Sequence, residues 1–254
     1  MRNVLAIAHK ELRSYFASPI AYVVIGFFAI LYGFFFSFIL QAFVRQAMQA
    51  GLMGGAQPMN VNQQVIRPVF QNVTVVALFL LPMVTMRTYS EEKRSGTIEL
   101  LLTSPLTDVQ IVLGKFLGAM ALYCAMLAIT IVHLGVLFLW GNPEWKPILT
   151  AYLGFVLFGG CFVSLGLFIS SLSKNQIVAG VVTFAVFLLL WVVSWIGSIT
   201  PEAEKLTSYL SIVEHFDDFT KGVIDTSHLI YYLSFITFGL FLTVKSVESE
   251  RWRG

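Results

Sequence analysis

Six stretches of this chain contain no Asp, Glu, Lys or Arg, and each is long enough to cross a bilayer as a helix. They lie between Arg13 and Arg45, Arg67 and Arg87, Lys115 and Glu144, Lys146 and Lys174, Lys174 and Glu202, and Asp225 and Lys245. A helix of about 20 apolar residues spans the hydrocarbon core, and a helix satisfies its own backbone hydrogen bonds there. The sequence therefore predicts an all-α membrane protein with six transmembrane helices.

The composition leaves little chain for a soluble domain. Of the 254 residues, 57% are hydrophobic and 12% are charged, and the mean hydropathy is +0.80. Soluble proteins have about a quarter of their residues charged. We expect one transmembrane domain over residues 1–254. The net charge of +2 is divided between the two membrane sides and forms no basic stripe, so nucleic acid is not an expected partner.

The two cysteines are not expected to form a disulfide, and the first span is not expected to be a signal peptide. Cys124 and Cys161 both fall inside apolar stretches, which favours small buried side chains over a disulfide framework. The apolar run from Ile20 to Leu40 exceeds the roughly 15 residues of a signal-peptide core, and no clear Ala-x-Ala site follows it. We therefore expect the N-terminus to be retained.

The distribution of Lys and Arg predicts which side of the membrane each loop faces. Six spans place both termini on one side, and that side carries 11 of the 16 basic residues. These are Arg2, Lys10, Arg13, Arg87, Lys93, Arg94, Lys115, Lys174, Lys245, Arg251 and Arg253. The other side carries Arg45, Arg67, Lys146, Lys205 and Lys221, and a flexible loop from Arg45 to Gln64 is expected there. Because cytoplasmic loops are enriched in Lys and Arg, both termini should be cytoplasmic.

Residues 1–18 predict an amphipathic helix that lies on the inner leaflet. One face carries Val4, Leu5, Ala8, Leu12, Tyr15 and Phe16, and the other carries Arg2, His9, Lys10 and Arg13. Ser18 and Pro19 suit the N-cap and first position of a new helix, so the chain should turn there from lying flat to spanning. The alternative is a plain extension of the first span.

Residues 88–113 join spans two and three on the cytoplasmic side and contain several helix boundaries. Gly96 is a natural residue to end a helix, and Thr97 can cap a short new helix. Pro105 then ends that helix, and Thr107 with Gln110 forms a capping box for the helix of span three. We expect a helix, a break, a short helix and another break.

The short helix of this loop carries three leucines in a row, Leu100, Leu101 and Leu102. So short a helix cannot bury all three against itself. They need a partner surface, the bilayer interface, or the cytoplasmic ends of neighbouring spans.

Three features inside the spans predict helix contacts. Gly114 and Gly118 have the spacing that lets two helices approach closely. Pro82 should kink span two just before the loop. His133 lies deep in span three, where it could face a cavity, and the favoured interpretation is a neutral ring with one hydrogen bond to a neighbouring helix.

ABC-2 type transporter permeases have a cytoplasmic loop that resembles the stretch from Glu91 to Lys115, EEKRSGTIELLLTSPLTDVQIVLGK. The opening AIAHKELRSYFASPIAYVV is similar to the interfacial helix that begins these permeases. The late stretch YLSIVEHFDDFTKGVIDTSHLIYYLS resembles the outer segment of their gliding-motility-associated subgroup, and more distantly the permease that serves copper-site maturation in nitrous oxide reductase. The resemblance covers the whole chain.

The resemblance implies a six-span subunit that pairs into a dimer and binds ABC ATPase subunits from the cytoplasm. It assigns the coupling helix and its approach to Glu91, Glu92, Gly96, Thr97, Ile98, Glu99, Leu100, Leu101 and Leu102. It assigns contacts of the interfacial helix to Lys10, Glu11, Leu12 and Arg13. It also implies a bacterial cytoplasmic (inner) membrane as the location.

The outer segment, residues 200–227, is too apolar for a free loop. Apolar residues recur there at near-helical spacing, at Leu206, Leu210, Val213, Phe216 and Val223. We expect one or two short helices that dip into the outer leaflet, as the resemblance implies. Its polar cluster and two aromatic residues could form an outer gate made of His215, Phe216, Asp217, Asp218 and Phe219. Glu214, His215, Asp217 and Asp218 could in principle bind a metal, but a structural or gating role is favoured and no metal site is predicted.

The expected function is that of a transmembrane permease subunit, and export is the favoured direction of transport. The chain has no G-x-x-x-x-G-K-[ST] loop, because Gly114-Lys115 lacks the upstream glycine. No cofactor is expected in this chain, and ATP and Mg would bind to two copies of a partner ATPase. A second permease subunit, identical or a close paralogue, lipid and an extracytoplasmic accessory protein complete the expected partners.

Two rival functions belong to other classes. In one, the same ATPase-driven motion acts on an outer partner, as mechanotransmission or an assembly scaffold, and nothing crosses the membrane. The other is an intramembrane enzyme. It is disfavoured because no paired carboxylates, HExxH or GxSxG nucleophile elbow lies in or near a span.

Overall fold

The computed structural model describes residues 1–52, 60–197, 207 and 209–252; most of these residues are helical and none of them forms a strand. Six helices are long and apolar enough to cross a membrane. They are Pro19–Leu52, Asn62–Ser95, Asp108–Trp140, Trp145–Leu172, Gln176–Val193 and Thr226–Arg251. The all-α class and the six spans expected from the charge-free stretches are confirmed.

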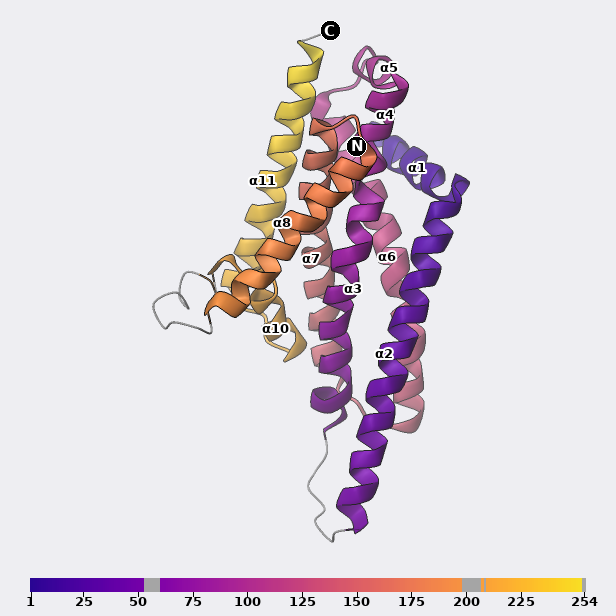
Figure 1. Cartoon of the computed structure of the whole chain (residues 1–254), viewed down its shortest axis with the longest axis vertical. Helices are drawn as coiled ribbons and strands as arrows, with labels where there is room; N and C mark the ends of the chain where they lie inside the picture. The colour runs from indigo at the N-terminus through magenta and orange to yellow at the C-terminus, as the bar shows by residue number, and fades with distance from the viewer. Residues whose placement is uncertain (53–59, 198–206, 208, 253–254) are drawn as a thin grey trace.

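The helices run along one long axis, with a shorter helix lying across one end (Figure 1). In chain order they are α1 (Arg2–Ala17), α2 (Pro19–Leu52), η1 (Asn62–Ile66), α3 (Arg67–Thr85), α4 (Arg87–Ser95), α5 (Ile98–Leu102), α6 (Asp108–Trp140), α7 (Trp145–Leu172), α8 (Gln176–Gly197), α10 (Glu214–Thr220) and α11 (Thr226–Arg251). Both termini, α4 and α5 lie toward the same end, which we call the terminal end.

The helix α7 forms the centre of the bundle. Of its most apolar window 78% is buried, compared with 17% for α8 and 17% for α11. It packs against α3, α4, α6, α8, α10 and α11. Its small residues permit this packing: a Cβ added at Gly166 would lie 2.3 Å from the Thr85 hydroxyl oxygen of α3. Four other spans, α3, α6, α8 and α11, therefore contact α7, while α2 packs on α3 and α6.

The helix α1 is separate from the first span, as predicted. The backbone breaks at Ser18, which is extended at φ −101° and ψ 146°, and the Ser18 hydroxyl accepts a hydrogen bond from the Ile20 amide at 3.4 Å. The predicted apolar face was only partly right. Its buried residues are Ile7, Glu11 and Tyr15, while Leu5 is 64% exposed. The reason is that α1 packs against α6, which sets the buried face by contact with another helix.

The close helix approach predicted at Gly114 and Gly118 is present, and the partner is α1. A Cβ added at Gly114 would lie 2.5 Å from the Ile7 Cβ, and one at Gly118 would lie 2.7 Å from the Glu11 Cβ. These two glycines therefore form the surface on which the N-terminal helix lies. The GxxxG spacing here joins a span to a helix that lies across the bundle.

The loop between spans two and three has the predicted sequence of helices and breaks. Gly96 adopts φ +72°, a left-handed conformation that glycine adopts without strain, and it separates α4 from α5. Thr107 and Gln110 form the capping box of α6. Thr97 precedes α5 but its side chain makes no capping bond, because its hydroxyl pairs with that of Ser95 at 2.9 Å.

Two other expectations, the extent of one loop and the contact of His133, differ from the structure. The loop predicted from Arg45 to Gln64 is shorter, because α2 continues to Leu52 and η1 begins at Asn62. Pro82 lies inside α3, which ends three residues later, at Thr85. The His133 Nδ1 atom lies 3.5 Å from the carbonyl oxygen of Ile129 on its own helix, not on a neighbouring one as predicted. Its ring contacts the aromatic rings of Tyr32 and Phe36 on α2.

The outer segment contains one described short helix, α10. Residues 198–206 and 208, which include the predicted apolar position Leu206, lie outside the described residues. Phe216 and Phe219 of α10 are 1% and 0% exposed. The Phe216 ring packs 4.7 Å from the ring of Phe155 on α7, so these aromatic residues contact the bundle itself.

The α1–α6 contact predicts unequal effects of the same substitution at two glycines of α6. Gly114→Ala should lower the free energy of unfolding by about 1–3 kcal/mol, because the added methyl group overlaps the β-branched Ile7. Gly135→Ala should be neutral or stabilising, because no atom lies within 4 Å of its added Cβ and alanine favours helix. Thermal unfolding of the purified protein in lipid nanodiscs measures both. Equal effects would show that α1 does not pack on Gly114.

Candidate functional site

A buried lysine joins three helices at the terminal end. Lys115 of α6 is 1% exposed, and its ammonium lies 2.9 Å from the Glu11 carboxylate of α1 and 2.8 Å from the Glu92 carboxylate of α4. It also donates a hydrogen bond to the Thr88 carbonyl oxygen at 3.0 Å and lies 4.9 Å from the centre of the Tyr89 ring. We call Glu11, Glu92 and Lys115 the buried ion cluster.

Local sequence explains how the buried ion cluster forms. Gly114 and Gly118 let α1 approach α6, so the short Glu11 side chain reaches the ammonium of Lys115. Glu92 lies one turn after Thr88 on α4. The Thr88 carbonyl oxygen and the Glu92 carboxylate therefore both face the Lys115 ammonium. An ammonium removed from water needs such charged and carbonyl partners to offset the loss of hydration.

A cavity of about 240 Å³ opens beside the cluster, between α1 and α4. It is lined by Lys10, Glu11, Ser14, Tyr15, Arg87, Thr88, Glu91, Glu92, Ser95 and Thr97. At its inner wall the Tyr15 hydroxyl donates to the Val84 carbonyl oxygen at 3.2 Å. Burial raises the pKa of Tyr15 well above its ordinary value, so the phenol stays neutral. The cavity therefore carries both signs of charge at its rim and a neutral donor at its base.

The helix α4 is fixed to the bundle at its first turn. Ser170 of α7 accepts hydrogen bonds from the amides of Tyr89 and Ser90, at 3.1 and 3.2 Å, and donates to the Met86 carbonyl oxygen at 2.9 Å. These bonds satisfy main-chain groups left without helical partners where α3 ends and α4 begins. Arg87 pairs with Glu91 at 2.8 Å and donates to the Ser18 hydroxyl at 3.1 Å.

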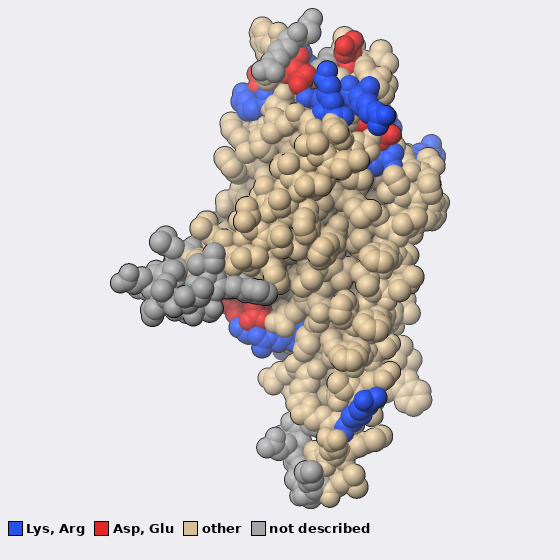
Figure 2. Space-filling view, in the orientation of Figure 1, with Lys and Arg blue, Asp and Glu red and all other residues tan. Residues whose placement is uncertain are grey.

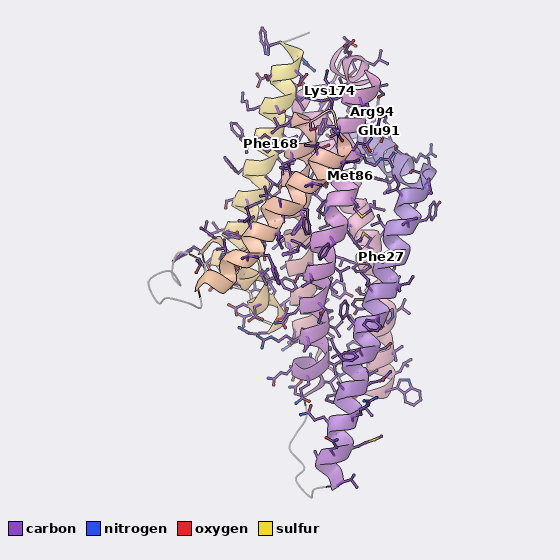
Figure 3. All side chains as sticks on the ribbon, in the orientation of Figure 1. Phe27, Met86, Glu91, Arg94, Phe168 and Lys174 are labelled. Carbon is purple, nitrogen blue, oxygen red and sulfur yellow. The ribbon has the colours of Figure 1, made fainter. Side chains whose placement is uncertain are left out.

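Ion pairs also join α11 to this end of the molecule. Lys93 of α4 pairs with Glu250, and Arg251 pairs with Asp108 of α6 at 2.8 Å. Figure 2 shows charged side chains gathered at the terminal end and a broad uncharged surface below them. Figure 3 shows Glu91 and Arg94 of α4 at that end, above Met86 at the α3–α4 junction.

The helix α5 presents its leucines unequally. Ile98 is buried, Leu101 packs partly against the core, and Leu100 is 74% exposed. Thr97 and Glu99 are exposed polar residues that precede Leu100, and the side chain of Leu102 lies outside the described residues. Only one leucine of the described pair is therefore free to contact another molecule.

The residues predicted for the outer gate lie in α10 and form a second polar cluster. Asp217 accepts two hydrogen bonds from one Arg67 guanidinium nitrogen of α3, both at 2.8 Å, and it also pairs with Lys221. These bonds outweigh burial and hold the pKa of Asp217 below its ordinary value. Lys221 and His228 likewise lower the pKa of Asp218. The polar side of α10 thus binds α3, while Phe216 and Phe219 face α7.

The structure places Glu91, Glu92, Gly96 and α5 at one end of the molecule, where Glu11 of α1 also lies. It turns Glu11 and Glu92 inward, toward Lys115, while Lys10 and Arg13 are exposed. Within the described residues, no group of three or more His, Cys, Asp or Glu side chains is placed to hold a metal ion.

Sequence reasoning missed the structural roles of Lys115 and Arg67. Lys115 was counted among the cytoplasmic charges, although it lies seven residues inside the helix that begins at Asp108. That position was a usable signal, because a lysine so far inside an apolar helix needs a buried partner. Arg67 was treated as an isolated loop residue, and its partner Asp217 is 150 residues away in the chain.

Comparison with known proteins identifies the same class of molecule from residue similarity. The family described as "ABC-2 family transporter protein" matches residues 5–246. A "Probable multidrug ABC transporter permease YbhR" from Escherichia coli (strain K12) is 30% identical over 200 residues, which is 72% of this chain and 53% of that protein. The protein of the same description from Escherichia coli O157:H7 has the same identity and coverage. The chain spans about half the length of these curated relatives.

Removal of the buried ammonium tests the ion cluster. Lys115→Met should lower the free energy of unfolding by about 3–5 kcal/mol, because the Glu11 and Glu92 carboxylates would be left without their cation. Adding Glu11→Gln and Glu92→Gln to that variant should recover most of the loss. Denaturant unfolding in detergent micelles measures each step.

Lys245→Met provides the matched control, because Lys245 pairs with Glu248 on an exposed face of α11. Its effect should stay within about 1 kcal/mol. If Lys115→Met lowered the free energy of unfolding as little as the control does, Lys115 would not be a buried cation on which Glu11 and Glu92 depend.

Proposed function

Because this chain belongs to the ABC-2 family of transporter proteins, we propose that it is the membrane-spanning subunit of a bacterial ABC exporter, driven by a separate ATPase. The family consists of transport permeases, and the six apolar helices make this one a multi-pass membrane protein. The single observation that carries the coupling role is the exposed Leu100 on α5. It stands at the terminal end of the molecule, on a short helix set off by the left-handed Gly96.

An exposed leucine on a short helix favours docking to another protein. Burying one leucine side chain contributes roughly 1.5–3 kcal/mol. Glu99, Leu100 and the cavity rim would form one continuous surface for the ATPase, since Glu91 and Thr97 line the cavity and belong to α4 and the start of α5. Glu91, Lys10 and Arg13 supply its exposed charges.

The helices behind this surface are arranged to move together. The buried ion cluster joins α1, α4 and α6, and Ser170 joins the start of α4 to α7. A displacement of α5 by the ATPase would therefore reach four helices through α4. For a near-complete switch between two conformations, nucleotide must favour one of them by about 5.5 kcal/mol.

The expected assembly has two permease subunits and two ATPase subunits. The spans α2, α8 and α11 have 22%, 17% and 17% of their apolar windows buried, which leaves apolar area for lipid and a second copy or close paralogue. The stretch from Tyr209 to Ser234 supports membership of the gliding-motility-associated subgroup, and α10 would serve as the outer gate. The ratio of 11 to 5 basic residues supports cytoplasmic termini in the inner membrane.

The docking proposal predicts that Leu100→Asp separates the permease from its ATPase. Loss of one buried leucine should weaken the complex about tenfold to a hundredfold, since about 1.4 kcal/mol corresponds to a factor of ten. Co-purification of the co-expressed ATPase, followed by permease-stimulated ATP hydrolysis, measures the loss. Retention of the ATPase with normal stimulated turnover would contradict docking at α5.

Two further variants separate docking from folding. Leu172→Asp is the matched control, because Leu172 is a 62% exposed leucine at the end of α7 and should leave the ATPase bound. Leu101→Asp should lower the thermal stability of the permease alone, because Leu101 packs against the core.

The proposed orientation predicts opposite accessibility of two engineered cysteines. In a Cys124→Ser background, Lys221→Cys should react with a membrane-impermeant thiol reagent on intact cells, because it lies beside α10 on the outer side. Ser104→Cys, in the loop after α5, should react only after lysis. The reverse pattern would place the termini outside.

A further inference from the structure

Two histidine rings contact each other where α10 meets α11. His215 lies on α10 and His228 in the first turn of α11, and their Nδ1 atoms are 2.6 Å apart. The Tyr231 ring stacks on His215 with ring centres 3.9 Å apart. A distance of 2.6 Å between two ring nitrogens requires one proton between them, donated by one ring and accepted by the other.

Both outer nitrogens of this histidine pair face acceptors. The His228 Nε2 atom lies 3.0 Å from a carboxylate oxygen of Asp218, and the His215 Nε2 atom lies 3.3 Å from the carbonyl oxygen of Tyr209. A carboxylate and a carbonyl can only accept, so each outer nitrogen must carry a proton. The three contacts together need three N–H protons.

Two neutral imidazoles carry only two N–H protons between them, and two imidazolium rings carry four. The neutral pair therefore leaves one of the three contacts without a proton. The doubly charged pair places two N–H groups against each other at 2.6 Å. Only the pair with one added proton satisfies every contact.

We propose that His215 and His228 form a binding site for a single proton, which completes the hydrogen-bonded chain from Asp218 through both rings to the Tyr209 carbonyl. The site does not depend on the ATPase or on the cargo of the permease. Its ligand is a proton taken from the aqueous phase on the side opposite the termini.

The surroundings indicate which ring carries the charge. His215 is 7% exposed, and burial lowers its pKa, with the neighbouring His228 lowering it further. His228 lies against Asp218, whose own pKa is held low by Lys221 and His228, so a carboxylate faces it. The added proton therefore resides on His228, which donates from Nε2 to Asp218 and from Nδ1 to His215. Neutral His215 then donates from Nε2 to Tyr209.

Other charged and titratable groups surround the pair. On α10 and at its C-terminal end, the described groups are Glu214, Asp217, Asp218 and Lys221. At α11 they are Asp225, Tyr231 and Tyr232. From other elements come Tyr209, Arg67, which pairs with Asp217, and Cys161 of α7, which contacts the Tyr232 carbonyl. Glu202, Glu204 and Lys205 lie outside the described residues. A cavity of about 480 Å³, lined by both rings, gives water access to the site.

Loss of the proton should release the weakest contact first. In the neutral pair, His215 donates to His228 and its own Nε2 lone pair then faces the Tyr209 carbonyl, at the longest of the three distances. The proton therefore holds the segment that precedes α10 against α10 and α11.

Nitrogen-15 NMR of histidine-labelled full-length protein in lipid nanodiscs tests the site. The chain has four histidines, so His9→Gln, His133→Gln, His215→Gln and His228→Gln assign every signal. In the wild type, the pair should titrate in two steps separated by more than about one pH unit, with the shared Nδ1 proton visible between them. Removal of either partner should leave the other ring with one simple step.

Amide hydrogen exchange reports whether the added proton stabilises the residues just before α10. The Ser211 amide donates to the Thr207 carbonyl oxygen at 2.9 Å. The protection factor of this amide, which is the intrinsic exchange rate divided by the observed rate at the same pH, should rise as pH falls through the first step. This dependence should disappear in His215→Gln and in His228→Gln and persist in His9→Gln. Independent titration of the two rings, with midpoints that do not move when the partner is removed, would overturn the proposal. So would a Ser211 protection factor that does not change with pH in the wild type.

Discussion

The ammonium of Lys115 is removed from water, and the arrangement of the terminal end follows from its need for opposite charge. Neither acidic partner lies on its own helix, since Glu11 belongs to α1 and Glu92 to α4. A single cation surrounded by two carboxylates carries net negative charge, and Lys10 at 3.7 Å from Glu92 reduces it from the exposed side. The cluster thus joins α1, α4 and α6 to one another at the terminal end.

The buried ion cluster depends on sterics as much as on charge. Glu11 reaches Lys115 because Gly118 presents no side chain beneath it. The same logic applies at the centre of the bundle, where α7 meets its neighbours through small residues. Packing of α1 on α6 supports the proposed ATPase surface, while Gly96 and Thr97 connect α5 to α4 and leave Leu100 exposed.

Local rules predicted much of this fold from the sequence, and long-range pairing accounts for most of the rest. Charge-free length predicted the spans, and capping chemistry predicted the breaks at Ser18, Gly96 and Thr107, because those signals act over a few residues. The buried face of α1 was only partly predicted, since contact with α6 decides it. The ion pairs of Lys115 and the histidine pair join residues that periodicity cannot relate. For the candidate site, the sequence located α5 but could not distinguish exposed Leu100 from packed Leu101.

The order in which the chain is synthesised gives the buried ion cluster a consequence for membrane insertion. Glu11 precedes its cation by 104 residues. At about 5–20 residues per second, α1 leaves the ribosome roughly 5 to 20 seconds before Lys115 does. During that interval α1 has neither its glycine surface nor its counter-ion. The helix α1 can therefore pack in its final position only after α6, the third span, has been synthesised.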